Sequence, residues 1–154
     1  MALGETAPKA ARPTCDFDAD HIAVKLRVTL AAERSAVDPV VREVMEIVRQ
    51  MGCADGREDA IELALAEALA NAVVHGAKND PTKIVECDVA CDEERGMLIV
   101  VRDPGPGFDP HRIPDCCTGQ NLYSNHGRGI FLINQLMDEI RFQKNGTEIH
   151  MVKR

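Results

Sequence analysis

The segment that most constrains the fold runs from Asp55 to the turn at Asn79-Asp80-Pro81, where apolar residues recur at helical spacing. Alanines and leucines make this predicted helix apolar nearly all round, so we expect it to be buried. Glu67 and Asn71 nevertheless stand in its middle, one turn apart on the same face. A buried carboxylate and amide need compensation, and Mg²⁺ would provide it because it takes oxygen ligands, often only one or two from the protein. A solvated helix face is the alternative.

A second motif, Asp103-Pro104-Gly105-Pro106-Gly107, follows the uninterrupted apolar run from Met97 to Val101. The apolar run predicts a central strand. An acidic residue at the end of that strand can accept a hydrogen bond from an exocyclic amine, and the two glycines let the backbone pass close to a flat ring. A tight turn capped by the aspartate is the alternative interpretation.

A third motif, Asn125-His126-Gly127-Arg128-Gly129, stands at the entry to a predicted helix that opens at Gly129. Free amides at a helix N-terminus beside glycines suit a phosphate group. The glycine-rich, irregular stretch that precedes it, from Pro104 to Arg128, is typical of a functional lid or a disordered loop.

The remaining periodicities complete the predicted order of elements. An alternating strand over 21–30 precedes a helix that Asp38 caps, Pro39 enters and Gly52 ends. Further strands are predicted over 82–91, 96–103, 139–143 and 147–152, the last two joined by an Asn-Gly hairpin. The order predicts an α+β, two-layer sandwich: a mostly antiparallel mixed sheet with three helices on one face.

Length and charge set the limits of function. The chain has 154 residues, and we interpret residues 1–20 as a flexible leader and 21–154 as one domain. A net charge of −7 argues against a nucleic-acid surface, which needs clustered Lys and Arg. No apolar run could cross a bilayer and no signal peptide is evident, so we expect a cytoplasmic protein with no membrane partner and with its six cysteines as free thiols.

Taken together, the order and spacing of these motifs resemble the GHKL ATPases, which have the Bergerat, or histidine-kinase-like, ATPase fold. The run from Glu67 to Gly76 looks like the N box of that family, Asp103 to Gly107 like its adenine-binding box, and Gly127-Arg128-Gly129 like its lid-closing box. Gly146-Thr147 matches the Gly-Thr of the last strand pair. The resemblance covers about residues 20 to 153.

Within the family, the chain is similar to the anti-sigma-factor serine/threonine kinases. Gly127 to Ile133, followed by Leu136-Met137-Asp138, is typical of that branch, as is the Asn-Ala-x-x-His-Gly end of the N box. The resemblance implies a protein kinase that binds a sigma factor and phosphorylates an anti-sigma-factor antagonist. Relatives commonly dimerise, so it also allows a homodimer.

The resemblance further implies ATP or ADP and Mg²⁺ as ligands and gives each motif a role. Glu67 would be the catalytic base that takes the proton from a serine or threonine hydroxyl, and Asn71 would hold the metal. Asp103 would bind the adenine amino group with Thr147 beside it. The other implied nucleotide-binding residues, which approach the ring or cradle the phosphates, are Gly105, Gly107, Gly127, Arg128 and Gly129.

Two alternatives to the kinase stay open. A nucleotide-dependent anti-sigma or switch protein without significant transfer activity would need the same nucleotide site but no carboxylate at Glu67. An ATP-hydrolysing domain of a larger assembly would use water in place of the hydroxyl. His75 is interpreted either as a partner of Glu67 or as a packed histidine, and Arg42 and Arg49 either as partner-facing or as solvated residues.

Overall fold

The computed structural model describes residues 22–92, 94–107 and 125–154, without the side chains of 22–24 and 125–128. The expected leader and most of the expected lid, with Cys116 and Cys117, lie outside the described residues. The described elements follow one another in the order that the sequence predicts. In chain order they are β1 (Ile22–Ala31), η3 (Arg34–Ala36), α2 (Val37–Met51), α3 (Glu58–Asn71), η4 (Ala72–Gly76), β2 (Ile84–Asp92), β3 (Gly96–Arg102), α4 (Asn125–Leu136), β4 (Glu139–Gln143) and β5 (Glu148–Lys153).

The five strands form one sheet in the order β1-β2-β3-β5-β4, and every pair of neighbours is antiparallel. β3 therefore occupies the centre, which confirms the interpretation of its apolar run. The sheet is therefore entirely antiparallel, whereas a mostly antiparallel mixed sheet was expected. The hairpin between β4 and β5 also forms, with positive φ at Lys144, Asn145 and Gly146, as short hairpin turns require.

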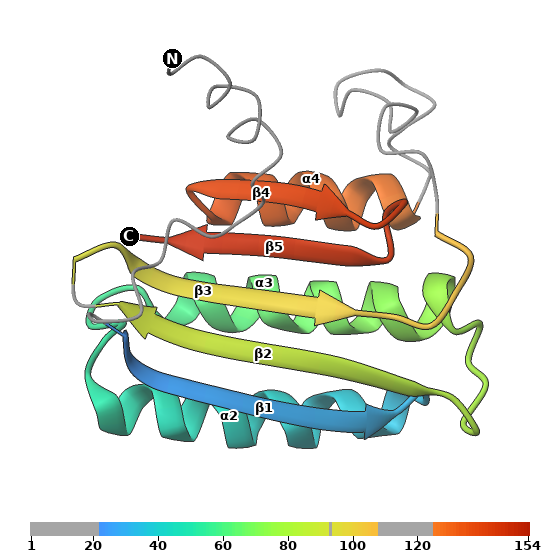
Figure 1. Ribbon diagram of the computed structural model, residues 1–154, viewed down its shortest axis with the longest axis horizontal. Helices are drawn as coiled ribbons and strands as arrows, with labels where there is room; N and C mark the ends of the chain where they lie inside the picture. Colours follow the sequence, from blue (N-terminus) through green and yellow to red (C-terminus); the bar gives the residue numbers. More distant parts are fainter. Residues whose placement is uncertain (1–21, 93, 108–124) are drawn as a thin grey trace, which may run out of the picture.

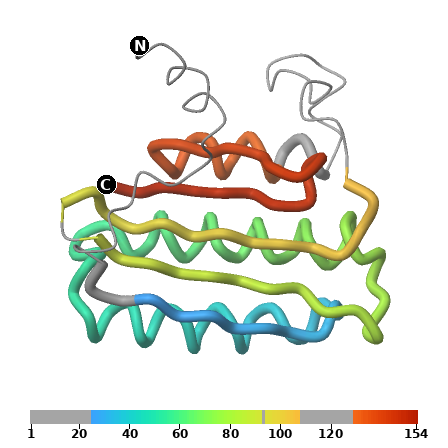
Figure 2. The backbone as a smooth tube through the Cα atoms, in the orientation of Figure 1, coloured from blue at the N-terminus to red at the C-terminus, as the bar shows by residue number. Residues whose placement is uncertain are grey.

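Helices α2, α3 and α4 all cover the same face of the sheet and run along the strands (Figures 1 and 2). This is the two-layer α+β sandwich predicted from the sequence. The core lies between the layers, where Met45, Leu65 and Met151 are fully buried. α3 occupies the middle of the helical layer and contacts both α2 and α4, which explains why it is apolar around most of its circumference.

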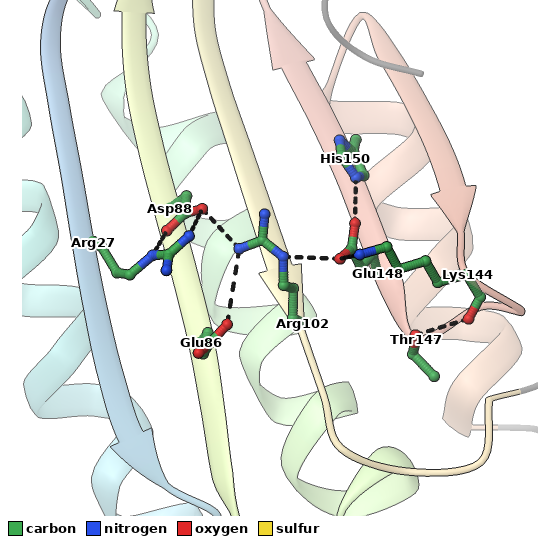
Figure 3. A network of polar contacts seen from close by, with 8 residues as sticks. All are labelled: Arg27, Glu86, Asp88, Arg102, Lys144, Thr147, Glu148 and His150. Carbon is green, nitrogen blue, oxygen red and sulfur yellow. Dashed lines mark hydrogen bonds and ion pairs between the residues drawn. The ribbon is translucent and has the colours of Figure 1, made fainter. Parts of the chain in front are cut away.

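The opposite face of the sheet carries a ladder of charged side chains (Figure 3). Asp88 on β2 pairs with Arg27 on β1 at 2.7 Å and with Arg102 on β3 at 2.7 Å. Arg102 also donates to Glu148 on β5 at 2.8 Å, and His150 lies 3.0 Å from the other Glu148 oxygen. The ladder links four adjacent strands, so the sheet face opposite the helices is held together by charge-assisted hydrogen bonds.

Three helix starts differ from the prediction. α2 begins at Val37, so Asp38 lies inside its first turn and is not its cap; the short 3₁₀ turn η3 leads the backbone into the helix with Ala36 already in the right-handed region. α3 begins at Glu58 rather than Asp55. α4 begins at Asn125, one turn before the predicted start. Gly52 ends α2 as predicted, with φ 72°.

The C-terminal end of α3 widens into the π turn η4. Ala77 donates its backbone N–H to the carbonyl of Ala72, five residues back, at 2.8 Å. Wide turns of this kind insert an extra residue into the helix and recur at functional sites. No helix among the described residues is long and apolar enough to cross a membrane.

Candidate functional site

A cavity of about 260 Å³ opens between α3, α4 and the β3-β5-β4 part of the sheet. Four of the predicted site residues line it, from the helix, the strand end and the hairpin: Asn71, Asp103, Gly107 and Thr147. The apolar part of its wall includes Ala68, Ala72, Val101, Ile130, Ile133, Phe142 and Ile149. A cavity that combines an apolar wall with converging polar groups suits a flat organic ring.

One end of the cavity is built by the contact of Gly76 with Asp103. A Cβ atom at Gly76 would lie 2.6 Å from Asp103 Cβ, and a Cβ at Gly105 would lie 3.0 Å from Asp103 Oδ1. Asp103 Oδ1 accepts a hydrogen bond from the backbone N–H of Gly105 at 2.8 Å. Glycine is therefore needed at both positions, because the Gly76 and Gly105 backbones lie so close to the Asp103 carboxylate that neither position has room for a side chain.

Burial raises the pKa of Asp103, and the hydrogen bond from the Gly105 N–H opposes this effect without cancelling it. The backbone N–H of Asp103 donates to the Thr147 carbonyl at 2.9 Å. Asp103 is thus a half-buried acceptor with a fixed backbone, as recognition of an amine donor requires.

The segment that leaves the strand end is fixed against the β4–β5 hairpin. Gly107 has φ 82°, and a Cβ there would lie 3.2 Å from Thr147 Cγ2. Thr147 in turn donates its hydroxyl to the Lys144 carbonyl at 2.8 Å. The glycine and the hairpin threonine, far apart in sequence, therefore form one wall of the cavity.

Glu67 lines a second hollow, a recess of about 420 Å³ that Gly129 and Leu132 of α4 also line. Asn71 and His75 line both the cavity and this recess, so the two adjoin at these side chains. Gly129 of α4 packs against the same place: a Cβ there would lie 3.0 Å from Asn71 Nδ2 and 3.1 Å from Glu67 Oε2. The N-terminal half of α4 thus lies close to both polar residues of the predicted N box.

The structure brings together seven of the nine predicted site residues, all but Gly127 and Arg128. The backbones of these two lie in the first turn of α4, and the Arg128 side chain is outside the described residues. His75 proves to be a half-buried wall residue beside Glu67. Arg49 is held by an exposed ion pair with Glu62 at 2.8 Å.

Sequence reasoning missed Lys78 and Phe142 in the cavity and Arg34 in the recess. Phe142 alternates with Ile140 on β4, a period that could have placed it on the helix-facing side. Lys78 has φ 55° in the turn after η4, and Arg34 lies on η3. The positions of both depend on irregular turns that leave no periodic signal.

The residues present fit Mg²⁺ as a partly hydrated ion. Asn71 offers one amide oxygen at the junction of the two hollows. The described residues contain no group of three or more His, Cys, Asp or Glu side chains that could hold a metal. Mg²⁺ often takes only one or two ligands from the protein and the rest from phosphates and water, so one amide oxygen can serve. Cys53 and Cys87 are free thiols, and burial raises the pKa of Cys87 to about 12.

Residues 30–153 match the family described as histidine kinase-like ATPase domain. Curated relatives include the anti-sigma F factor of Bacillus cytotoxicus, 32% identical over 133 residues that cover 82% of this chain and 80% of that protein. The anti-sigma F factor of Geobacillus thermodenitrificans is 31% identical over 134 residues, covering 82% and 80% of the two chains. That of Clostridium acetobutylicum is 28% identical over 133 residues, covering 83% and 82%. The chain therefore belongs to the histidine kinase-like ATPase domain family, the GHKL ATPases, in the branch that includes the anti-sigma F factors.

Proposed function

We propose that this chain is an ATP-dependent serine/threonine protein kinase that binds a sigma factor and phosphorylates an anti-sigma-factor antagonist. The observation that carries the proposal is the contact of Gly129 with both Glu67 and Asn71. It joins a carboxylate, a metal-type amide and helix α4 beside a cavity that Asp103 also lines.

In this proposal the adenine ring enters the apolar cavity and donates its amino hydrogen to Asp103, with Thr147 at the same wall. Gly105 and Gly107 let the backbone lie against the ring. The first turn of α4, which contains Gly127 and Arg128, binds the phosphates. Gly129 lies just beyond that turn, where the absence of a side chain leaves room for Asn71 and Glu67. Mg²⁺ held by Asn71 would neutralise phosphate charge.

Glu67 then acts as the base for transfer. The acceptor hydroxyl must reach the γ-phosphorus while its proton has somewhere to go, and a carboxylate in an open recess beside the cavity can accept it. Glu67 makes no hydrogen bond or ion pair to the described residues, so its oxygens are free to accept that proton.

The protein partners come from the relatives. Proteins about 30% identical over four-fifths of the chain carry the name anti-sigma F factor, which supports a sigma factor as one partner of this chain. The antagonist would be the phosphoryl acceptor, and the phosphate would weaken its binding by adding negative charge at an interface.

The experiment pairs calorimetry with label transfer. Mg·ATP is titrated into the wild type and into Asn71→Ala and Asp103→Asn, and both variants should bind sharply more weakly. Labelled ATP is then supplied with candidate antagonists to the wild type and to Glu67→Gln, which should bind ATP normally but transfer nothing. Binding without transfer by the wild type would support a nucleotide-dependent switch, and label in free phosphate would support hydrolysis. No adenine nucleotide binding at all would overturn the proposal.

A further inference from the structure

The recess beside Glu67 has a second charged wall. Arg34, on the 3₁₀ turn η3 before α2, lines it together with the α3 residues Glu67 and Asn71, and Leu132 of α4 also lines it. The recess is thus built from η3, from α3 with its continuation η4, and from α4. It is distinct from the cavity that holds Asp103, which Arg34 does not line.

Arg34 and Glu67 face the same recess without pairing with each other. Arg34 is exposed, and neither side chain forms an ion pair or hydrogen bond with any residue in the described ranges. Opposite charges that share a recess gain energy by approaching. The recess that the guanidinium and the carboxylate share has a volume of about 420 Å³, which gives room for a phosphoryl group.

Phosphoryl transfer requires such a pair of groups. The acceptor hydroxyl oxygen forms a bond to the γ-phosphorus, the bond from that phosphorus to the bridging oxygen breaks, and ADP leaves with the bonding electrons. The hydroxyl proton passes to Glu67. The negative charge of the phosphoryl group meanwhile moves from the ADP side towards the acceptor side.

The cations that the sequence reasoning missed are divided between these two sides. Lys78 lines the nucleotide cavity and Arg34 lines the recess. A planar guanidinium can bind two phosphoryl oxygens at once, which an ammonium group cannot do. Its position beside Glu67 suits the side on which the acceptor arrives.

We propose that the recess is the acceptor side of the transfer site and that Arg34 is a catalytic residue that binds the phosphoryl group in transit. This inference rests on the proposed function and assigns a residue and a subsite that the sequence motifs do not contain. It makes the end of β1 and the start of α2 part of the transfer site, although all four sequence motifs lie after Asp55.

The test uses a mimic of the transferring phosphoryl group and needs no acceptor protein. Affinities for Mg·ADP alone and for Mg·ADP with aluminium fluoride are measured by competition with a fluorescent ADP analogue. The variants are Arg34→Gln, Arg34→Lys and, as the matched control, Arg57→Gln, which removes another exposed arginine that lines neither hollow. Melting temperatures check that each variant is folded.

All four proteins should bind Mg·ADP alike, because Arg34 does not line the nucleotide cavity. Fluoride should tighten binding to the wild type and to Arg57→Gln. Arg34→Gln should lose about 10- to 100-fold of that affinity, the loss expected for a charge-assisted hydrogen bond. Arg34→Lys should retain part of it.

A full fluoride effect in Arg34→Gln, or none in a wild type that binds Mg·ADP, would overturn this inference and leave the nucleotide site standing. Failure of the wild type to bind Mg·ADP would overturn the proposed function and this inference with it.

Discussion

Gly76 at the end of η4 and Asp103 at the end of β3 lie in direct contact, with the position of a Gly76 Cβ only 2.6 Å from Asp103 Cβ. The wide turn η4 thus presses against the carboxylate that we expect to recognise adenine. Any side chain at Gly76 must displace Asp103 or move the turn.

Gly76→Ala is therefore expected to weaken ATP binding by about 10- to 100-fold, because the displaced carboxylate loses its hydrogen bond to the ligand. The free energy of unfolding should fall by about 1–3 kcal/mol, as for other overpacked sites. Calorimetry with Mg·ATP and urea unfolding measure the two effects. Unchanged ATP affinity in a folded variant would contradict the importance of this contact.

Gly129→Ala tests the other end of the site. Its methyl group would approach Asn71 and Glu67 at 3.0–3.2 Å, and both neighbours are the ends of side chains that can move. We expect a folded protein that keeps its affinity for metal-free ADP but loses the extra affinity that Mg²⁺ provides. Titrations of ADP with and without Mg²⁺ measure this difference, and equal metal dependence in variant and wild type would speak against Asn71 as the metal ligand.

Asp103→Asn should remove a pH dependence of binding. Burial raises the pKa of Asp103, and adenine binding favours the ionised carboxylate, so wild-type affinity for ATP should fall as the pH drops through that raised value. The asparagine variant should bind about 10- to 100-fold more weakly at neutral pH and show a flatter profile. Calorimetry from neutral to mildly acidic pH provides both curves.

The sign for stability is opposite. A raised pKa in the folded state means that ionising Asp103 at neutral pH costs folding energy, and that the full stability is present only below the pKa of the unfolded chain. The unliganded Asp103→Asn protein should consequently be at least as stable as the wild type at neutral pH. A marked loss of stability would show that the ionised carboxylate is a structural group.

Arg102→Met should destabilise the ladder on the sheet face opposite the helices. Arg102 pairs with both Asp88 and Glu148, and the Glu148 side chain is only 7% exposed. Loss of the Arg102 guanidinium therefore leaves the buried Glu148 carboxylate with fewer partners. We expect about 2 kcal/mol of destabilisation in urea, less than for a fully buried pair because Arg102 is partly solvated. Arg49→Met, which breaks an exposed pair, should cost no more than about 1 kcal/mol.

The same ladder predicts acid sensitivity. The hydrogen bond from Arg27, with that from Arg102, lowers the pKa of Asp88 despite its partial burial. Burial alone would raise the pKa of Glu148, but hydrogen bonds from His150, Lys144 and Arg102 outweigh it, so the pKa is lowered. Lowered carboxylate pKa values give stability that is present at neutral pH and lost as the pH falls through them. Urea midpoints across the acidic range should fall less steeply in Arg102→Met than in the wild type.

The order of elements could be predicted because each has a local cause. The period of β1, the apolar run of β3 and the left-handed Gly52 are properties of neighbouring residues. The polar pair Glu67 and Asn71, half-buried in the structure, was visible for the same reason, since helical spacing alone puts the two residues on one face.

What could not be predicted depends on how elements meet. The contact of Gly76 with Asp103 is formed only after the β2–β3 hairpin returns the chain to the end of α3. Asp38-Pro39 looks like a helix start, yet the turn at Arg34–Ala36 begins the helix earlier. Because that turn also carries Arg34 into the recess, the error at the helix start concealed a charged wall of the site.

The two faces of β5 belong to two different parts of the molecule. Thr147, just before it, and Ile149 line the nucleotide cavity, while Glu148 and His150 point to the opposite face and join the charged ladder. Because alternate residues of a strand face opposite sides, mutations can change the ladder side of β5 without changing the residues that line the nucleotide cavity. A lineage could thus change what meets the sheet face opposite the helices through substitutions at Glu148 and His150, and keep the same nucleotide throughout.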